Sequence, residues 1–259
     1  MRKGLQRPTD TSHLGPWVDG DDLVDVYDSW VSQASLDTEG AVDALAELAG
    51  PGPVLELAIG TGRLALPLLE RGLEVHGIDA SEAMVGQLRS KPGGERIRVT
   101  IGNLADVGVN FGARYRLIFV VFNTLFGLRT RSEQARTFAN VASRLADDGV
   151  FVVEGSVPNL GRFEGADQTS VEKVHLEDIT LVDASRHDSD AQRVDSEHIC
   201  IRANGVSVVK FSIVYAYSSQ LDAMANDAGL RLRARYGGWR GEARRGDEDP
   251  FVAIYERAV

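Results

Sequence analysis

Cysteine is nearly absent from this sequence: Cys200 is the only one among 259 residues. A single cysteine cannot form a disulfide within the chain, so we expect a reducing compartment, the cytoplasm. Long apolar runs are missing as well, and no stretch approaches the roughly 20 residues that a membrane span requires. The first twelve residues are polar and lack the apolar core of a secretory signal. The sequence therefore predicts no membrane partner.

Positive charge is also scarce. The 28 lysine and arginine residues are outnumbered by 38 acidic residues, which gives a net charge of −10. A surface that binds nucleic acid needs positive potential, so this balance argues against a nucleic-acid partner. The chain does have an ordinary globular composition, with 43% hydrophobic and 25% charged residues. Its length suits one large α/β domain or two small ones.

From residue 54 onward, short apolar runs alternate with amphipathic stretches, a pattern typical of parallel βαβ units. The predicted fold class is α/β, with a doubly wound seven-stranded sheet whose last strand is antiparallel. We expect strands at residues 54–57, 73–78, 96–101, 116–122, 150–154, 230–236 and 251–255. Helices are expected at 39–49, after residue 63, at 81–90, from a capping box at Thr130-Arg-Ser-Glu133 to Gly149, and at 219–228.

Residues 172–217 have a different pattern, in which apolar and polar residues alternate between turn residues near Ser189 and at Asn204-Gly205. Such alternation predicts antiparallel strands, and we expect a three-stranded sheet inserted between strands five and six. We divide the chain into an N-terminal arm with lid helices (1–50), a core (51–155), the insert (156–218) and a C-terminal completion of the core sheet (219–259). In the sixth strand, Arg231, Arg233 and Arg235 alternate with apolar residues, which predicts a solvated face.

The stretch Val54-Leu-Glu56-Leu-Ala-Ile-Gly60-Thr-Gly62-Arg63 combines a buried strand, a small-residue turn and the start of a helix. The two glycines allow backbone N–H groups to approach a ligand closely, and the helix start adds positive potential. Gly60-Thr-Gly62-Arg-Leu-Ala65 also satisfies the spacing of a dinucleotide fingerprint. An NAD(P)-dependent oxidoreductase is therefore one interpretation of this stretch.

Glu56 favours a different cofactor. A pyrophosphate at the glycine turn would face this carboxylate at a substantial electrostatic cost. S-adenosylmethionine has no phosphate, its ammonium suits a carboxylate, and its own carboxylate could lie near Arg63. Asp79, nineteen residues after Gly60 at the tip of the second strand, can accept hydrogen bonds from a ribose diol.

These residues resemble the motifs of class I (Rossmann-like) S-adenosylmethionine-dependent methyltransferases. The stretch from Glu56 to Arg63 is similar to the first motif, E/D-x-G-x-G-x-G, with Ala58 in the first glycine position. The stretch from Gly77 to Met84 is similar to the second motif. Gly102-Asn103-Leu104 stands where the family often has Gly-Asp-hydrophobic, and Phe122-Asn123-Thr124 matches the position that flanks the sulfonium. The resemblance covers about residues 22–155 and 219–259.

The resemblance implies that the chain binds S-adenosylmethionine and releases S-adenosylhomocysteine. A tyrosine in a helix over the cofactor and the motif residues make up the predicted cofactor site: Tyr27, Glu56, Ala58, Gly60, Thr61, Gly62, Arg63, Asp79, Ala80, Met84, Asn103, Leu104, Phe122 and Asn123. No metal site is predicted.

The insert resembles that of small-molecule N- and O-methyltransferases of bacterial natural-product pathways, including sugar N,N-dimethyltransferases. In that subgroup the insert roofs the acceptor pocket and can contribute to homodimer contacts. The predicted function is therefore methyl transfer to an N or O atom of a small molecule, such as a natural-product or amino-sugar intermediate. The alternatives are an NAD(P)-dependent oxidoreductase and a non-catalytic S-adenosylmethionine-binding protein.

An acceptor amine must lose its proton before it attacks, and an alcohol benefits from a base. Some sugar N-methyltransferases have a histidine just past the fourth strand, but residues 122–128 contain none. The candidates for acid–base catalysis are His198 and His187 in the insert and Glu154 at the end of the fifth strand. His198 follows Glu197 in an alternating strand, so one of the two should face the pocket. The alternative for Glu154 is a hydrogen bond that anchors a loop.

Overall fold

The computed structural model describes residues 36–106, 114–163, 169–176, 179–203, 205–247 and 249–258, together with Val24, Tyr27 and Asp28. Most of the predicted N-terminal helix, which includes Trp30, lies outside the described residues. Within the part of the chain that is described, no helix is both long and apolar enough to cross a membrane.

The core is a seven-stranded sheet in the order β10-β11-β5-β4-β1-β2-β3. Only β11 is antiparallel, and it pairs with β10 on one side and with β5 on the other, which confirms the predicted fold class. The strands are β1 (Val54–Leu57), β2 (Val75–Asp79), β3 (Arg98–Ile101), β4 (Tyr115–Val120), β5 (Leu145–Gly155), β10 (Leu230–Tyr236) and β11 (Phe251–Arg257).

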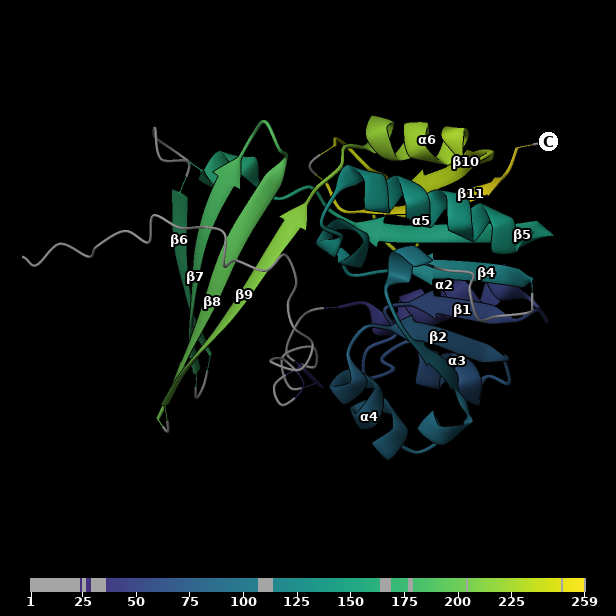
Figure 1. The fold of residues 1–259 in the computed structure, drawn as a ribbon, viewed down its shortest axis with the longest axis horizontal. Helices are drawn as coiled ribbons and strands as arrows, with labels where there is room; N and C mark the ends of the chain where they lie inside the picture. The colour runs from purple at the N-terminus through teal and green to yellow at the C-terminus, as the bar shows by residue number, and fades with distance from the viewer. Residues whose placement is uncertain are drawn as a thin grey trace, which may run out of the picture.

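Helices cover both faces of this sheet (Figure 1). They are α2 (Thr38–Ala49), α3 (Ala65–Glu70), α4 (Glu82–Ser90), α5 (Arg131–Arg144) and α6 (Ser218–Asp227). Alternate residues of each central strand point to opposite faces. As a result, Ile118 and Phe151 pack with α5 and α6, whereas Leu117 and Val150 pack with α2 and α3. A short 3₁₀ turn, η1 (Gly94–Arg96), follows α4, and three others follow strands: η2 (Leu104–Asp106), η3 (Thr124–Gly127) and η4 (Leu160–Arg162).

Helix α5 starts as predicted and ends earlier than predicted. The Thr130 side chain accepts from the Glu133 backbone N–H, and the Glu133 carboxylate accepts from the Thr130 N–H, which completes the capping box. The prediction that α5 runs to Gly149 is wrong, because β5 already begins at Leu145. Gly149 lies instead at an irregular part of β5, where a Cβ would lie 2.6 Å from the Tyr115 carbonyl oxygen. Its small size is needed for backbone packing.

The inserted sheet has four strands, so the three-stranded prediction is wrong. They are β6 (Thr169–Leu176), β7 (Ile179–Asp188), β8 (Arg193–Arg202) and β9 (Gly205–Val214), paired in sequence order. The sequence has no glycine or proline between Leu176 and Ile179 to mark the first turn. The alternating pattern therefore runs through that turn without a visible break.

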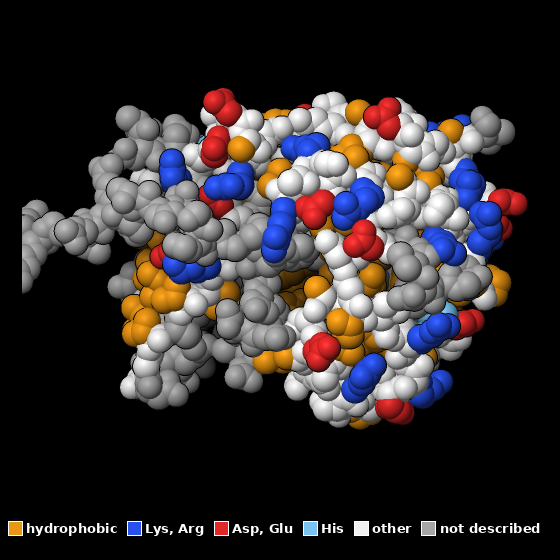
Figure 2. Space-filling model, in the orientation of Figure 1, with side chains coloured by type: hydrophobic (Ala, Val, Ile, Leu, Met, Phe, Trp, Pro, Cys, Tyr) orange, Lys and Arg blue, Asp and Glu red, His pale blue; other side chains and the backbone are white. Residues whose placement is uncertain are grey.

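The insert stands at the edge of the core where the parallel strands end (Figure 1). The molecular surface is hollowed between the insert and the core, and hydrophobic side chains gather over the insert (Figure 2). Among the insert residues whose side chains are described, exposed large apolar residues include Val171, Ile201, Val206 and Val208. The insert thus overhangs one edge of the sheet and presents an apolar surface.

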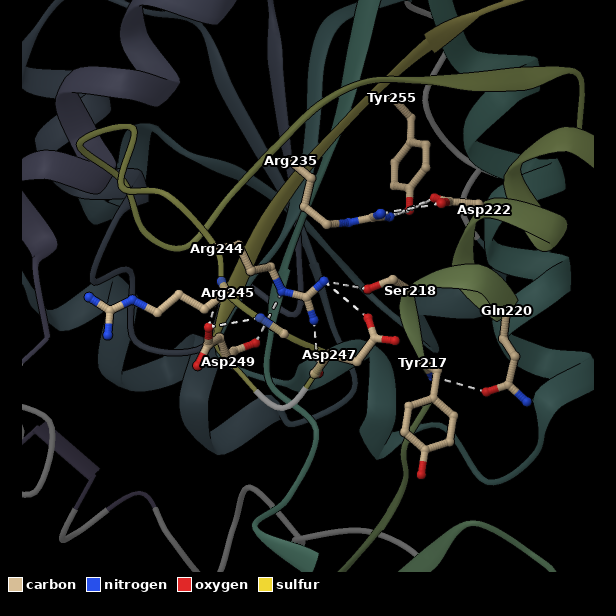
Figure 3. A network of polar contacts seen from close by, with 11 residues as sticks. Tyr217, Ser218, Gln220, Asp222, Arg235, Arg244, Arg245, Asp247, Asp249 and Tyr255 are labelled. Atoms are coloured by element: carbon tan, nitrogen blue, oxygen red, sulfur yellow. Dashed lines mark hydrogen bonds and ion pairs between the residues drawn. The ribbon is translucent and has the colours of Figure 1, made fainter.

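The arginines of β10 do not share one solvated face. Arg231 and Arg233 are exposed and face Glu256, as predicted. Arg235 differs, because its guanidinium donates to the Asp222 carboxylate (2.6 Å) and to the Tyr255 hydroxyl (3.0 Å) under α6 (Figure 3). A bulge in the pairing of β10 with β11 between Leu232 and Ala234 shifts the alternation, so a strict period of two misplaces Arg235.

Candidate functional site

The order in which the chain adds strands to the sheet reverses between β1 and β4, which are themselves parallel. The chain runs from β1 outward to β2 and β3, and then returns to place β4 and β5 on the other side of β1. In doubly wound sheets, ligands bind at the carboxyl ends of the strands at such a switch point. The glycine turn after β1 and the residues after β4 flank this position.

Glu56 is a buried carboxyl at this switch point, with 3% of its surface exposed. Its Oε2 has no hydrogen-bond partner within the described part of the chain. Burial raises the pKa of Glu56 to about 8, the Asp79 charge adds to this rise, and the Arg63 guanidinium opposes it. A buried carboxyl with an unsatisfied oxygen is costly unless a donor or cation completes it. The site therefore fits a cationic ligand group.

Tyr27 lies beside the same group of charges. Burial raises its pKa, and the charges of Arg63, Glu56 and Asp79 all act on its hydroxyl. The neighbouring Asp28 accepts from the Thr61 hydroxyl (2.6 Å) and pairs with Lys91 (2.7 Å). Tyr27 therefore lies close to the glycine turn.

The turn after β1 has left-handed backbone at three positions. The φ values are 58° at Ala58, 55° at Gly60 and 86° at Gly62. A Cβ at Gly62 would lie 2.3 Å from Leu88 Cδ1, whereas a Cβ at Gly60 would have nothing within 4 Å. Gly62 is thus required for packing on α4, and Gly60 leaves open space beside the turn. Ala58 adopts a conformation that glycine adopts more easily.

Asp79 closes the other side of this turn. Its carboxylate accepts from the Gly60 N–H (2.7 Å) and from the Ser81 N–H (2.9 Å). Burial raises the pKa of Asp79, and these bonds oppose the rise. Each carboxylate oxygen can accept more than one bond, so Asp79 can still receive a diol. The sequence does not reveal that it also fastens the glycine turn.

The remaining predicted cofactor residues follow β2 and β3. Ala80 is exposed, while Met84 and Leu104 are buried. Ser81 caps α4 by accepting from the Met84 N–H at 3.0 Å. The Asn103 side-chain oxygen accepts from the Ala105 N–H at 2.8 Å. One lone pair of that oxygen is therefore already used by the protein.

Phe122 and Asn123 form the tip of β4, each with a φ of 59°. The Arg63 guanidinium lies 5.9 Å from the centre of the Phe122 ring, and Arg63 also donates to the Thr38 hydroxyl (3.2 Å). The first motif and the tip of β4 are therefore in contact across the switch point.

The three acid–base candidates have different surroundings. His187 is buried at the base of the insert, its Nε2 lies 3.0 Å from the Tyr215 hydroxyl, and its ring packs on Phe163. Burial raises the pKa of Tyr215 to about 12. These contacts place His187 where the insert joins the core.

His198 lies farther along β8. Its Nε2 is 3.0 Å from the Asp183 carboxylate, and its ring packs edge-on against Phe211. Glu197 pairs with Lys210 on the opposite face of the sheet. His198, unlike the adjacent Glu197, lies on the face of the insert that also contains Val209 and Ser196. That face continues to Val194, which belongs to the core cluster.

Glu154 uses both of its carboxylate oxygens within the protein. Oε2 accepts from the Phe122 N–H (2.8 Å), and Oε1 accepts from the Trp239 indole N–H (3.2 Å). These contacts are of the kind expected from the alternative for Glu154, a hydrogen bond that anchors a loop. Sequence reasoning missed Trp239, because the glycines before it indicate only a loop.

The geometry suits S-adenosylmethionine better than a dinucleotide. A buried carboxyl with an unsatisfied oxygen beside the turn can ionise and pair with an ammonium, whereas its ionised form would be opposed by a pyrophosphate. Residues after β1, β2 and β4 surround the same edge, and β11 adds an antiparallel strand. This arrangement is typical of a Rossmann-like fold that binds a positively charged nucleoside.

Comparison with known proteins supports a methyltransferase. A family model described as a methyltransferase domain matches residues 54–149. The structure is similar to that of the CcbJ methyltransferase from Streptomyces caelestis, with 33% identity, a TM-score of 0.86, and coverage of 94% of this chain and 99% of that one. The structure of CalS10, an amino pentose methyltransferase from Micromonospora echinaspora with S-adenosylmethionine bound, has the same fold (22% identity, TM-score 0.64, 88% and 96% covered).

Among curated proteins, the putative methyltransferase YqeM from Bacillus subtilis is 28% identical over 129 residues, which cover 50% of this chain and 52% of YqeM. The chain thus spans about half the length of this relative. The chain belongs to the class I S-adenosylmethionine-dependent methyltransferases. As a member of that class, the chain uses S-adenosylmethionine as its cofactor.

Proposed function

We propose that this protein transfers the methyl group of S-adenosylmethionine to an N or O atom of a small molecule, such as a natural-product or amino-sugar intermediate. The insert is the observation that carries the proposal. It overhangs the edge of the sheet where the cofactor would bind (Figure 1), and the similarity to CcbJ extends over 94% of this chain. An insert at this edge can enclose a small acceptor, whereas a macromolecule would need open access.

When bound, the cofactor supplies a methyl group on a sulfonium, which an acceptor lone pair attacks in line. Glu56 would hold the ammonium of the cofactor, and Asp79 would hold the ribose hydroxyls while it keeps the glycine turn closed. Phe122 and Asn123 would border the reacting end. Much of the rate would then come from alignment of the two substrates.

A base is needed if the acceptor arrives as an ammonium. His198 fits this role better than His187, because Asp183 can orient its imidazole and the ring is not fully buried. We infer that Glu154 holds the turn after β4 and does not serve as the base, since the Phe122 N–H and the Trp239 indole N–H fix the orientation of its carboxylate.

A methyl-transfer assay tests the proposal. Purified protein is incubated with labelled S-adenosylmethionine and a panel of amino sugars, amino acids, other amines, phenols and carboxylic acids. The proposal predicts turnover on an amine or hydroxyl acceptor. Cofactor binding without turnover on any acceptor would favour a non-catalytic S-adenosylmethionine-binding protein, and hydride transfer with NAD(P) would favour an oxidoreductase.

We also propose a cytoplasmic location, which suits the single cysteine, and a homodimer. The exposed apolar residues of the insert, Ile201, Val206 and Val208, support a contact with a second copy of the chain. Light scattering of the purified protein at several concentrations would test it, with a monomer at all concentrations contradicting it.

A further inference from the structure

The tip of β4 has an unfavourable backbone conformation. Phe122 and Asn123 are consecutive, and both have a φ of 59°. Asparagine tolerates this left-handed region better than most residues, but a bulky residue such as phenylalanine rarely adopts it. Such strain persists only where the surroundings enforce it, and it occurs often at functional sites.

The end of β5 supplies these surroundings. Glu154 accepts from the Phe122 N–H at 2.8 Å, and the Ser156 N–H donates to the Asn123 side-chain oxygen at 2.7 Å. Gly155 lies between them, and a Cβ there would be 2.8 Å from that same oxygen. Glu154 near the end of β5 and Ser156 just past its end therefore hold the two residues of the turn, and the small Gly155 between them leaves room for the Asn123 side chain.

A second segment reaches the same carboxylate. The loop between β10 and β11 brings in Trp239, whose indole N–H donates to the other Glu154 oxygen at 3.2 Å. This loop is fastened on both sides. Arg240 donates to Asp37 at the start of α2 (2.8 Å). Arg244 donates to the Ser218 hydroxyl at the start of α6 (2.7 Å), a contact that Figure 3 shows.

The contacts form a closed circuit around the switch point. Arg63 of the first motif packs on the Phe122 ring and donates to Thr38. Asp37, the residue before Thr38, receives Arg240, and Arg240 follows Trp239 in the chain. Glu154 joins Trp239 to the Phe122 backbone and so completes the circuit.

We propose that Glu154 is a positioning residue for methyl transfer, which holds the Phe122–Asn123 turn against the reacting end of the cofactor with Trp239 as its second donor. This inference rests on the proposed function, because the turn matters only if the cofactor lies beside it. A carboxylate is suited to the position, since it offers an acceptor oxygen to each of two N–H donors and has no hydrogen to oppose them.

The Glu154→Gln substitution keeps the shape of the side chain and changes only its hydrogen-bonding groups. Its amide oxygen can accept from Phe122, but its NH₂ group would then face the Trp239 N–H, donor against donor. In the Trp239→Phe background that conflict disappears, because phenylalanine keeps an aromatic ring and donates nothing. The two substitutions should therefore be non-additive.

Calorimetric titration with S-adenosylhomocysteine measures this. We expect Glu154→Gln to weaken binding about tenfold and Trp239→Phe about threefold or less, with the double variant close to Trp239→Phe alone. Glu256→Gln is the matched control, because Glu256 accepts from exposed Arg231 at the opposite edge of the sheet. It should bind like the wild type.

Two further readouts separate positioning from general destabilisation. The Trp239 indole resonance should shift in Glu154→Gln, and the melting curve of each variant should show that it is fully folded at the temperature of the titration. Unchanged affinity in Glu154→Gln, or additive losses in the double variant, would overturn the inference. If wild-type protein fails to bind S-adenosylhomocysteine, the proposed function fails instead.

Discussion

Glu56 and Asp79 are both buried carboxyls at the same edge of the sheet, but their surroundings differ. Asp79 accepts two backbone N–H bonds, while one oxygen of Glu56 lacks a partner among the described residues. Each oxygen of Asp79 thus has one donor from the protein and can accept a further bond from a ligand, whereas one oxygen of Glu56 is left for a ligand alone. This difference gives the two carboxyls separate experimental signatures.

The high pKa of Glu56 predicts proton release on cofactor binding. At pH 7 the carboxyl, with a pKa of about 8, is mostly protonated in the free protein. A bound ammonium favours the ionised form, so about one proton should leave as the cofactor binds. Titration of S-adenosylhomocysteine in two buffers of different ionisation enthalpy measures this, and Glu56→Gln should abolish the release. Equal heats in both buffers would contradict the assignment.

The same shift affects stability without cofactor. The Glu56 contribution is fully present below the ordinary pKa of 4.5 and is lost as the pH rises through about 8. Glu56→Gln should therefore melt at a higher temperature than the wild type at pH 8, with little difference at pH 5. A melting difference that does not depend on pH would argue against this account.

Removal of the Asp79 side chain should weaken cofactor binding more than the loss of a single diol contact. Asp79→Ala loses the ribose acceptor and also releases the Gly60 N–H, so we expect a loss of at least about 1–2 kcal/mol. Asp79→Asn can keep one of the backbone bonds and should lose less. Titration with S-adenosylhomocysteine measures both, and unchanged affinity in Asp79→Ala would remove Asp79 from the site.

At the scale of single elements, the capping box of α5 offers a direct test. Thr130→Ala removes the acceptor for the Glu133 N–H at the start of the helix and should lower the free energy of unfolding by about 1 kcal/mol. Urea denaturation measures the change. Ser143→Ala, an exposed serine late in the same helix, should change stability by less than about 0.5 kcal/mol. Equal effects would argue against the cap.

Elements were predictable where one local signal dominates. β1 and β10 have the predicted bounds, because apolar strands there adjoin proline or glycine turns. The end of α5 and the number of insert strands were not predictable, since Gly149 serves close backbone packing and the first insert turn has no glycine or proline. Arg235 was misplaced by a bulge, which is a property of the strand pair and not of one strand.

In the site, too, features with a local sequence signal were predictable and features that depend on distant contacts were not. Its motif residues could be found from the sequence, because positive-φ turns and strand-end carboxylates leave local signals. The partners that hold them could not be found, since Trp239 lies 85 residues from Glu154 and Lys91 lies 30 residues from Thr61. Such contacts depend on the tertiary arrangement of loops.

At the scale of the whole molecule, Arg131 connects the insert to the core. From the start of α5, it donates to the Tyr215 carbonyl (2.7 Å) and to the Gln192 side chain (3.2 Å). Arg131→Ala should loosen the insert. On the proposal that the insert encloses the acceptor, it should lower kcat/KM for the acceptor at least about fivefold, while affinity for S-adenosylhomocysteine stays within about twofold. Arg136→Ala, which removes only an exposed ion pair with Asp106, is the control. A parallel loss of cofactor affinity in Arg131→Ala would contradict this division of roles.

The central claim is that the edge between β1 and β4 binds a cationic nucleoside and not a dinucleotide. Calorimetric titration of the wild-type protein with S-adenosylhomocysteine, NAD and NADP tests it most directly. The account predicts micromolar binding of S-adenosylhomocysteine and no heat with either dinucleotide. Tight binding of NAD or NADP, with no binding of S-adenosylhomocysteine, would contradict it.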